Sequence, residues 1–206
     1  MEIKSKNFCI VLSSPSGAGK TSISKKILTK DKSIALSISC TTRPRRVGEK
    51  NKKDYIFIDD LNFEKIKKEK AFLESAKVFG YQYGTLKKTI EDFFKKKKDV
   101  LFDIDWQGYQ QLKQSGQDVV GIFILPPSKK EVIQRLEKRG RDTKSEMKKR
   151  MNLVQDEISH FPEYDYVVIN KDINKCAYQI LSIIYTERLK RSRLTNLTKF
   201  VDKFRH

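Results

Sequence analysis

Residues 13–21 contain two glycines, a lysine and a threonine in an order that could bind phosphate. Gly17 and Gly19 allow backbone torsions that turn successive N–H groups toward one anion. Lys20 can reach the outer phosphates of a nucleotide, and the Thr21 hydroxyl can ligate Mg²⁺. The pattern G-x-x-x-x-G-K-[ST] is met except at Ser14, which replaces its first glycine. We therefore predict an ATP-binding loop made of Ser14, Pro15, Ser16, Gly17, Ala18, Gly19, Lys20 and Thr21.

The segments on either side of this loop are those that must position it. Phe8–Leu12 is apolar and predicts a buried parallel strand. Ser22–Leu28 predicts a helix whose N-terminal dipole would favour a bound anion. Strand, loop and helix in this order are the setting that the motif requires, which disfavours a chance match.

Two carboxylates lie at the C-terminal end of a second apolar strand, predicted at Val100–Ile104. Asp103 and Asp105 are two residues apart and therefore share one face of the strand end, where ligands gather in an open α/β sheet. We expect Asp103 to orient Mg²⁺, directly or through water. A helix cap is the alternative, and it suits Asp105 better than Asp103.

Hydroxyls and arginines come together in residues 39–46, which read SCTTRPRR and follow a strand predicted at Ile34–Ser39. Guanidinium groups bind phosphate in a forked geometry. This segment therefore predicts a second anion site, separate from the first loop.

A second group of arginines could act as a lid. Arg135 and Arg139 lie one helical turn apart beside Gly140, and Arg141 and Arg150 follow. Guanidinium groups stabilise the charge of a moving phosphoryl group, and a short Gly-containing segment can close over a site. A solvated surface position is the alternative for any one of these arginines. Two anion sites and a lid predict a kinase whose acceptor is itself a phosphate.

The remaining apolar patterns alternate between strands and helices. Strands are predicted at 55–58, 72–78, 81–83, 119–125 and 166–169, and helices at 62–70, 86–96, 106–113, 128–138, 142–160 and over the stripe from Ile173 to Ile184. This alternation predicts an α/β fold with a parallel sheet and helices on both faces. The closely spaced short strands between residues 55 and 83 predict an inserted small α+β lobe.

The length and composition suit one α/β domain. A chain of 206 residues can bury a core. No apolar run approaches the ~20 residues of a membrane span, and no signal peptide is visible. Cys9, Cys40 and Cys176 are too widely spaced for a metal site and predict buried, reduced thiols. We expect a cytoplasmic protein without a membrane partner, and self-association is left open.

The formal net charge of +18 makes nucleic-acid binding an alternative. Lysines cluster at 65–70, at 95–98 and in the tail at 190–205, but acids are interleaved throughout. The sequence contains no known nucleic-acid recognition motif. We therefore expect solvated basic faces and no specific nucleic-acid partner.

The order of these motifs resembles the guanylate kinase family. The similar segments run from Ser13 to Asn170 and read SSPSGAGKTS, SCTTRPRRVGE, DYIFI, FLESAKVFGYQYGT, DIDWQG, FILPPS, RLEKRG, KKRM and EYDYVVIN. The resemblance implies a P-loop kinase core at 1–36 and 98–206, a GMP-binding lobe at about 37–97 and an arginine lid at about 135–151. It also implies transfer of the ATP γ-phosphoryl group to GMP, and to dGMP, with Mg²⁺, in purine nucleotide metabolism.

The same resemblance implies roles for individual residues. Arg43, Arg46, Tyr55 and Tyr83 would hold the GMP phosphate; Ser39, Glu74, Thr85 and Asp105 would surround guanine; Lys20, Arg43, Arg135, Arg139 and Arg150 would serve catalysis; and Asn170 would contact adenine. Arg45 is the alternative to Arg46 as the second phosphate arginine, and the register from Gly48 favours Arg46.

The chemistry of guanine agrees with these roles. Guanine presents N1–H and its N2 amino group side by side, so that the Glu74 carboxylate can accept from both. Adenine would place a lone pair against that carboxylate, which strongly disfavours it. The acceptor phosphate is already an anion, because its second pKa is about 6. No general base is then needed, and we expect catalysis by alignment and charge neutralisation.

Two other functions stay open at this stage. A guanylate-kinase-like scaffold domain would bind partners without catalysis, but such domains usually lose the loop lysine that is present here as Lys20. A P-loop kinase with a different acceptor would share the fold, because fold alone does not fix the substrate.

Overall fold

The computed structural model describes residues 2–139 and 154–205 of the chain. Its centre is a sheet in the order β10-β9-β2-β8-β3, in which every neighbouring pair is parallel. The strands of this core sheet are β2 (Cys9–Ser13), β3 (Ile34–Leu36), β8 (Asp99–Asp103), β9 (Val119–Leu125) and β10 (Tyr166–Ile169). The predicted α/β fold with a parallel sheet is confirmed.

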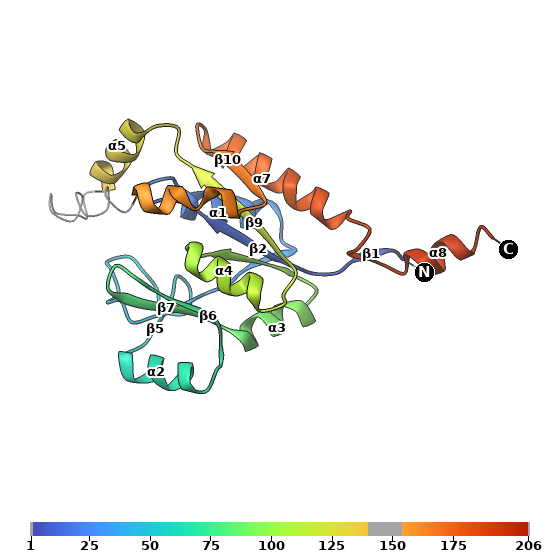
Figure 1. The fold of residues 1–206 in the computed structure, drawn as a ribbon, viewed down its shortest axis with the longest axis horizontal. Helices are drawn as coiled ribbons and strands as arrows, with labels where there is room; N and C mark the ends of the chain where they lie inside the picture. Colours follow the sequence, from blue (N-terminus) through green and yellow to red (C-terminus); the bar gives the residue numbers. More distant parts are fainter. Residues whose placement is uncertain (1, 140–153, 206) are drawn as a thin grey trace.

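Helices cover both faces of the core sheet (Figure 1). They are α1 (Lys20–Lys30) and α7 (Ile173–Arg188) on one face and α3 (Lys87–Lys95) and α4 (Trp106–Gln114) on the other. Successive residues of β2 alternate between these layers, because strand side chains point to opposite faces. Ile10 and Leu12 pack with α1 and α7, whereas Cys9 and Val11 pack with α3 and α4. All four side chains are fully buried.

A second sheet lies beside the core, in the order β5-β4-β7-β6. Its strands are β4 (Cys40–Thr41), β5 (Ile56–Phe57), β6 (Phe72–Val78) and β7 (Tyr81–Leu86). Helix α2 (Asp60–Lys68) packs on it through Phe63, whose ring centroid is 4.5 Å from that of Phe72. This sheet and helix form the lower part of Figure 1. They lie within the predicted lobe at 37–97, and the boundaries of that lobe stay a prediction.

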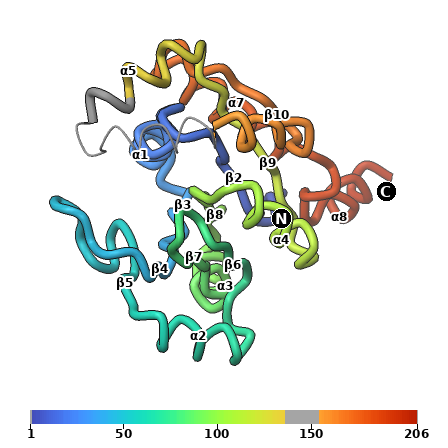
Figure 2. The backbone as a smooth tube through the Cα atoms, turned by 60° about the vertical axis from the view of Figure 1, so that its left-hand side comes forward, coloured from blue at the N-terminus to red at the C-terminus, as the bar shows by residue number. Residues whose placement is uncertain are grey.

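Segments near the two ends of the chain lie side by side (Figures 1 and 2). Strand β1 (Lys4–Ser5) pairs antiparallel with β11 (Leu194–Thr195), and α8 (Leu197–Asp202) follows. Arg193 precedes β11 and is 5% exposed, with hydrogen bonds to Asp118 and Glu187. Burial works against its charge, but these two carboxylates raise the pKa of Arg193.

One predicted strand needs correction, and one predicted helix is described only in part. The strand expected at 34–39 ends at Leu36, because the chain leaves the core sheet there and Cys40–Thr41 pairs within the second sheet. Of the helix expected at 142–160, residues 154–159 are helical, and residues 142–153 lie outside the described residues. Helix α5 (Lys129–Arg139) begins as predicted, since the Glu131 N–H donates to Ser128 Oγ at 3.2 Å. A short 3₁₀ helix, η1 (Phe161–Glu163), precedes β10.

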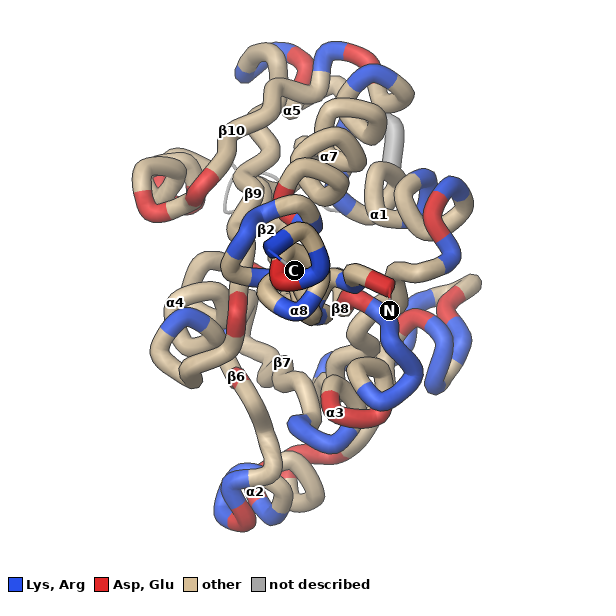
Figure 3. Tube along the Cα trace, turned by 90° about the vertical axis from the view of Figure 1, so that its right-hand side faces the viewer, with Lys and Arg blue, Asp and Glu red and all other residues tan. Residues whose placement is uncertain are grey.

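The charged residues are spread over many elements. Figure 3 shows lysine and arginine on several helices, with acidic residues between them on α2 and α3. Cys9, Cys40 and Cys176 are buried free thiols, as predicted. Within residues 2–139 and 154–205, no helix is long and apolar enough to cross a membrane.

Candidate functional site

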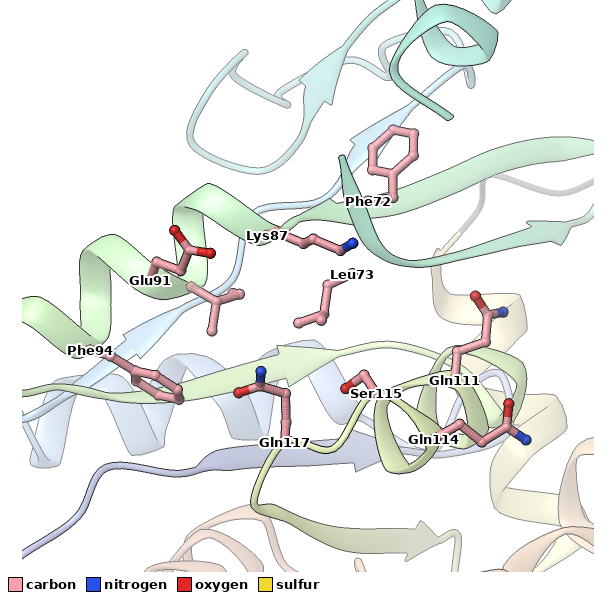
Figure 4. Close-up of a pocket in the computed structure, with 10 residues that line it drawn as sticks. Phe72, Leu73, Lys87, Glu91, Phe94, Gln111, Gln114, Ser115 and Gln117 are labelled. Atoms are coloured by element: carbon pink, nitrogen blue, oxygen red, sulfur yellow. The ribbon is translucent and has the colours of Figure 1, made fainter. Parts of the chain in front are cut away.

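A cavity of about 220 Å³ opens where the core sheet meets the second sheet. It brings together residues predicted from distant parts of the sequence, namely Ser14, Pro15, Ser16, Gly17, Gly19, Lys20, Thr21, Ser39, Arg46, Tyr55, Glu74, Tyr83, Asp103 and Asp105. A larger cavity of about 480 Å³ lies between β6, α3 and α4 and is lined by none of the predicted site residues (Figure 4). The smaller cavity is therefore the candidate site, because it holds the groups that can do chemistry.

The phosphate loop connects β2 to α1 and turns at two glycines. Gly17 and Gly19 have φ of +86° and +95°, the left-handed region that glycine enters without strain. A Cβ on Gly19 would also lie 2.6 Å from Asn170 Nδ2. That position therefore requires glycine for its conformation and for its close neighbour.

Lys20 lies at the start of α1 and faces the end of β8. Its Nζ is 2.7 Å from Asp103 Oδ1 and donates to the Ile104 carbonyl at 3.1 Å. Thr21 Oγ1 donates to Asp103 Oδ2 at 3.4 Å. The structure thus places the predicted lysine, hydroxyl and carboxylate together at the carboxyl ends of neighbouring strands, where open α/β sheets bind ligands.

Two further predicted residues contact the backbone of the loop. Asn170 Nδ2 donates to the Ala18 carbonyl at 2.7 Å. Arg135 donates to the carbonyls of Ala18, at 3.5 Å, and Asn170, at 3.3 Å. Arg139 is the last residue of α5, but its side chain lies outside the described residues, as does all of Arg150.

At the opposite wall of the cavity, Glu74 projects from β6 and is 3% exposed. Its Oε1 has no hydrogen-bond partner among the residues that the structure describes. Burial raises the pKa of Glu74 to about 7, with a further contribution from the charge of Asp105, while Thr85 acts in the opposite direction. Buried hydrogen-bond acceptors normally have a donor, so this oxygen is suited to a ligand that donates a hydrogen bond to it.

Small polar groups surround this carboxylate. Ser39 Oγ and Thr85 Oγ1 are 3.4 Å apart, and both side chains are buried. Asp105 caps α4 by accepting from the Gly108 N–H at 3.0 Å, so the cap predicted as its alternative role is present. A Cβ on Gly108 would lie 2.8 Å from Glu74 Oε2, which shows how closely α4 approaches the acid.

The residues of the predicted second anion site lie in the loop that follows β4 and around it. Arg43 is 7% exposed and donates to Glu49 Oε1 at 2.7 Å, and its guanidinium carbon lies 5.4 Å from the centroid of the Tyr55 ring. The rings of Tyr55 and Tyr83 meet edge to face, with centroids 5.9 Å apart. Arg46 lines the cavity with both tyrosines, which supports Arg46 over Arg45 as the second phosphate arginine.

Comparison with known proteins agrees with this geometry. The family model for guanylate kinase matches residues 6–187. The chain belongs to the guanylate kinase family. A guanylate kinase from Novosphingobium aromaticivorans is 50% identical over 192 residues, covering 93% of this chain and 87% of that protein. One from Paramagnetospirillum magneticum is 44% identical over 204 residues, covering 98% and 95%. The crystal structure of guanylate kinase from Anaplasma phagocytophilum matches with a TM-score of 0.82 at 36% identity, covering 98% of this chain and 96% of that chain.

Two residues of this guanylate kinase site were missed in the sequence. Glu49 holds Arg43 and also accepts from the Arg46 N–H at 2.8 Å. Glu157 accepts from the Ser16 N–H at 2.9 Å and lines the cavity. The segment RRVGE placed Glu49 close to the arginines, so a nearby counter-ion could have been predicted. No sequence pattern connected Glu157 to a loop 141 residues away.

Proposed function

We propose that this cleft transfers the γ-phosphoryl group of ATP to GMP, giving ADP and GDP. The observation that carries the proposal is the presence of the buried Glu74 carboxylate and the Lys20 loop in the walls of one cavity. A carboxylate suited to guanine and a lysine suited to phosphate therefore line the same cavity. dGMP is included as an acceptor, since no residue is assigned to the ribose 2′-hydroxyl. The reaction belongs to purine nucleotide metabolism, and a cytoplasmic location is part of the same proposal.

The donor, ATP, is assigned to the phosphate loop. The backbone N–H groups of the loop from Ser16 to Thr21 surround its phosphates, and Lys20 exchanges Asp103 for a phosphate oxygen. Arg135 already contacts the loop, and Arg139 and Arg150 are assigned to phosphoryl transfer by resemblance. Asn170 uses its Nδ2 on the loop, so its Oδ1 is the atom we assign to the amino group of adenine.

The acceptor base is assigned to the buried wall of the cavity. Glu74 accepts from guanine N1–H and the N2 amino group, which gives its buried carboxylate the donors that it needs. Ser39 or Thr85 donates to guanine O6, and Asp105 lies beside the same edge. AMP is rejected because adenine has no donor at N1 and no N2 amino group.

The acceptor phosphate is assigned to Arg43, Arg46, Tyr55 and Tyr83. Burial raises the pKa of Tyr55, so its hydroxyl stays protonated and can donate. Arg43 is held in the site by Glu49 and by the Tyr55 ring, so that less side-chain freedom is lost when phosphate binds.

The chemical step needs alignment and charge neutralisation. The GMP phosphate is largely deprotonated at neutral pH and attacks without a general base. Lys20 and the arginines of both anion sites hold the two phosphates close together and stabilise the charge that spreads over the transferred group.

A magnesium ion fits the residues at the start of α1 and the end of β8. Thr21 Oγ1 and Asp103 Oδ2 are hard oxygen donors 3.4 Å apart, and Mg²⁺ is commonly held by one or two protein oxygens together with nucleotide phosphates. We propose that these two residues hold it, Asp103 directly or through water. When bound, Mg²⁺ supplies positive charge that offsets the charge of the phosphates.

A coupled ADP-release assay tests this function. ATP and Mg²⁺ are supplied, and GMP, AMP, UMP and CMP are offered separately at physiological salt. Turnover confined to GMP among these four is the expected result. Turnover with a different acceptor would identify a P-loop kinase of other specificity. Nucleotide binding without any turnover would identify a binding module.

A further inference from the structure

The carboxylate of Glu157 contacts the phosphate loop directly. Glu157 lies in the helical segment 154–159, and its Oε2 accepts from the Ser16 N–H at 2.9 Å. Glu157 and Ser16 line the same cavity as Lys20 and Thr21. None of the roles assigned above uses Glu157.

This contact uses a donor that the loop would otherwise offer to phosphate. Phosphate-binding loops hold their ligand with successive backbone N–H groups. A backbone N–H has one hydrogen, so a carboxylate and a phosphate oxygen cannot both accept from Ser16 at 2.9 Å with good geometry. The two anions would also repel each other in a partly buried cavity, where charges are weakly screened.

The surroundings of Glu157 make its charge costly. Burial raises the pKa of Glu157, and the charges of Asp105 and Asp156 act in the same direction. The Ser16 N–H and the Lys20 ammonium oppose this shift. The carboxylate is therefore stabilised mainly by the same groups that ATP phosphates would use.

We propose that Glu157 sets the affinity of the loop for ATP, since a phosphate oxygen must displace its carboxylate from the Ser16 N–H. The inference rests on the proposed function, in which this loop binds ATP. Glu157 is then a positioning residue, which holds the loop through Ser16 and opposes ATP through its charge.

The substitution Glu157→Gln separates charge from shape. A glutamine keeps an oxygen that can accept from Ser16 but removes the negative charge. We expect the Kd for ATP to fall by about three- to tenfold, as for the loss of one like charge near a phosphate. Adenosine lacks phosphates, so its Kd stays unchanged in the same variant. Both constants are measured by isothermal titration calorimetry on the full chain.

Asp156→Asn is the matched control. It removes the same charge one residue away, where the side chain is exposed, and we expect the Kd for ATP to change by less than about twofold. Should Glu157→Gln fail to fold in a thermal melt, Glu157→Ala carries the same prediction, because it removes both the negative charge and the oxygen that competes for the Ser16 N–H.

ATP binding by Glu157→Gln that is equal to or weaker than that of the wild type would overturn the inference. The same holds for an equal gain with adenosine, since the effect would then not act on phosphate. A wild-type chain that does not bind ATP would overturn the proposed function together with this inference, whereas normal ATP binding and an unchanged variant would overturn the inference alone.

Discussion

The half of the cleft assigned to ATP is called the donor half here. In it, Lys20, Arg135 and the Ser16 N–H each already contact an oxygen of the protein. In the half assigned to GMP, the acceptor half, one buried oxygen of Glu74 has no hydrogen-bond partner among the described residues. When ATP binds, a phosphate oxygen can replace the protein oxygen at each of these contacts. Each exchange therefore changes the binding free energy only modestly. In the acceptor half, a ligand gains binding free energy by donating to the buried Glu74 oxygen. A ligand that cannot donate to this oxygen is strongly disfavoured.

The two halves therefore recognise different parts of the substrates. The donor half holds a feature common to all nucleoside triphosphates, the phosphate chain, with backbone N–H groups and a lysine. The acceptor half recognises the edge of one base with a buried acid. We therefore expect substitutions in the donor half to affect the chemical step and those around Glu74 to affect the choice of acceptor.

The largest effect is expected for Lys20→Met. Removing the ammonium group takes away charge stabilisation of the phosphates in transfer, and kcat should fall by about 10³-fold. GMP binding should be retained, because Glu74 lies in the other half. The coupled ADP-release assay and a GMP titration measure the two quantities. Lys25→Met, at an exposed position of the same helix, is the control. A kcat within tenfold of the wild type would argue against a role of Lys20 in transfer.

The next effect is expected for Glu74→Gln. The amide offers one oxygen and adds two N–H donors, so it cannot accept from guanine N1–H and N2 together, and kcat/KM for GMP should fall by about 10²-fold. The Kd for ATP should be unchanged, and Glu64→Gln on α2 is the exposed control. Loss of ATP binding in Glu74→Gln would show that the two halves are not separate.

A smaller effect separates the two candidate phosphate arginines. Arg46→Ala should raise KM for GMP by about 30-fold, in the range of a lost charge-assisted hydrogen bond. Arg45→Ala should change KM by less than about twofold, the behaviour of a solvated charge. Steady-state kinetics with varied GMP compares the two variants. The reverse order of effects would assign the phosphate to Arg45.

The smallest effect is a pH dependence. Burial raises the pKa of Glu74 to about 7, so the fraction of ionised carboxylate increases as pH rises through that value. GMP needs the ionised form, and kcat/KM for GMP should be about tenfold lower at pH 6 than at pH 8. GMP itself titrates near pH 6, so Glu74→Gln serves as the control and should retain only the part of the profile that belongs to the ligand. An identical profile in both proteins would contradict the role of Glu74.

Local patterns in the sequence predicted the fold and the phosphate loop. The phosphate loop, the strand before it and the end of β8 were predictable because each depends on residues close together in the chain. Arg46, Tyr55, Glu74 and Tyr83 were assigned through the resemblance, and the structure brings them into one cavity. Their roles in binding stay predictions.

The features that were missed depend on pairs of residues far apart in the chain. Arg193 was counted in the solvated basic tail, but it is buried against Asp118, 75 residues away, and lies over the Phe8 ring. Strands β1 and β11 have two residues each, too few for a period to be visible. Glu157 belongs to a polar segment and gives no apolar pattern that would locate its neighbour. The positions of these residues depend on tertiary contacts, which local sequence patterns do not show.

In the proposed function, Glu74 selects guanine by accepting from two neighbouring donors. The most direct measurement compares kcat/KM of the wild-type chain for GMP, IMP and AMP at pH 8. IMP keeps N1–H but lacks the N2 amino group, and AMP offers neither donor. We expect a graded series, with kcat/KM for IMP lower than for GMP by about tenfold, for one lost hydrogen bond to a charged group, and kcat/KM for AMP lower again by at least as much. Equal use of IMP and GMP, or of AMP and IMP, would contradict it.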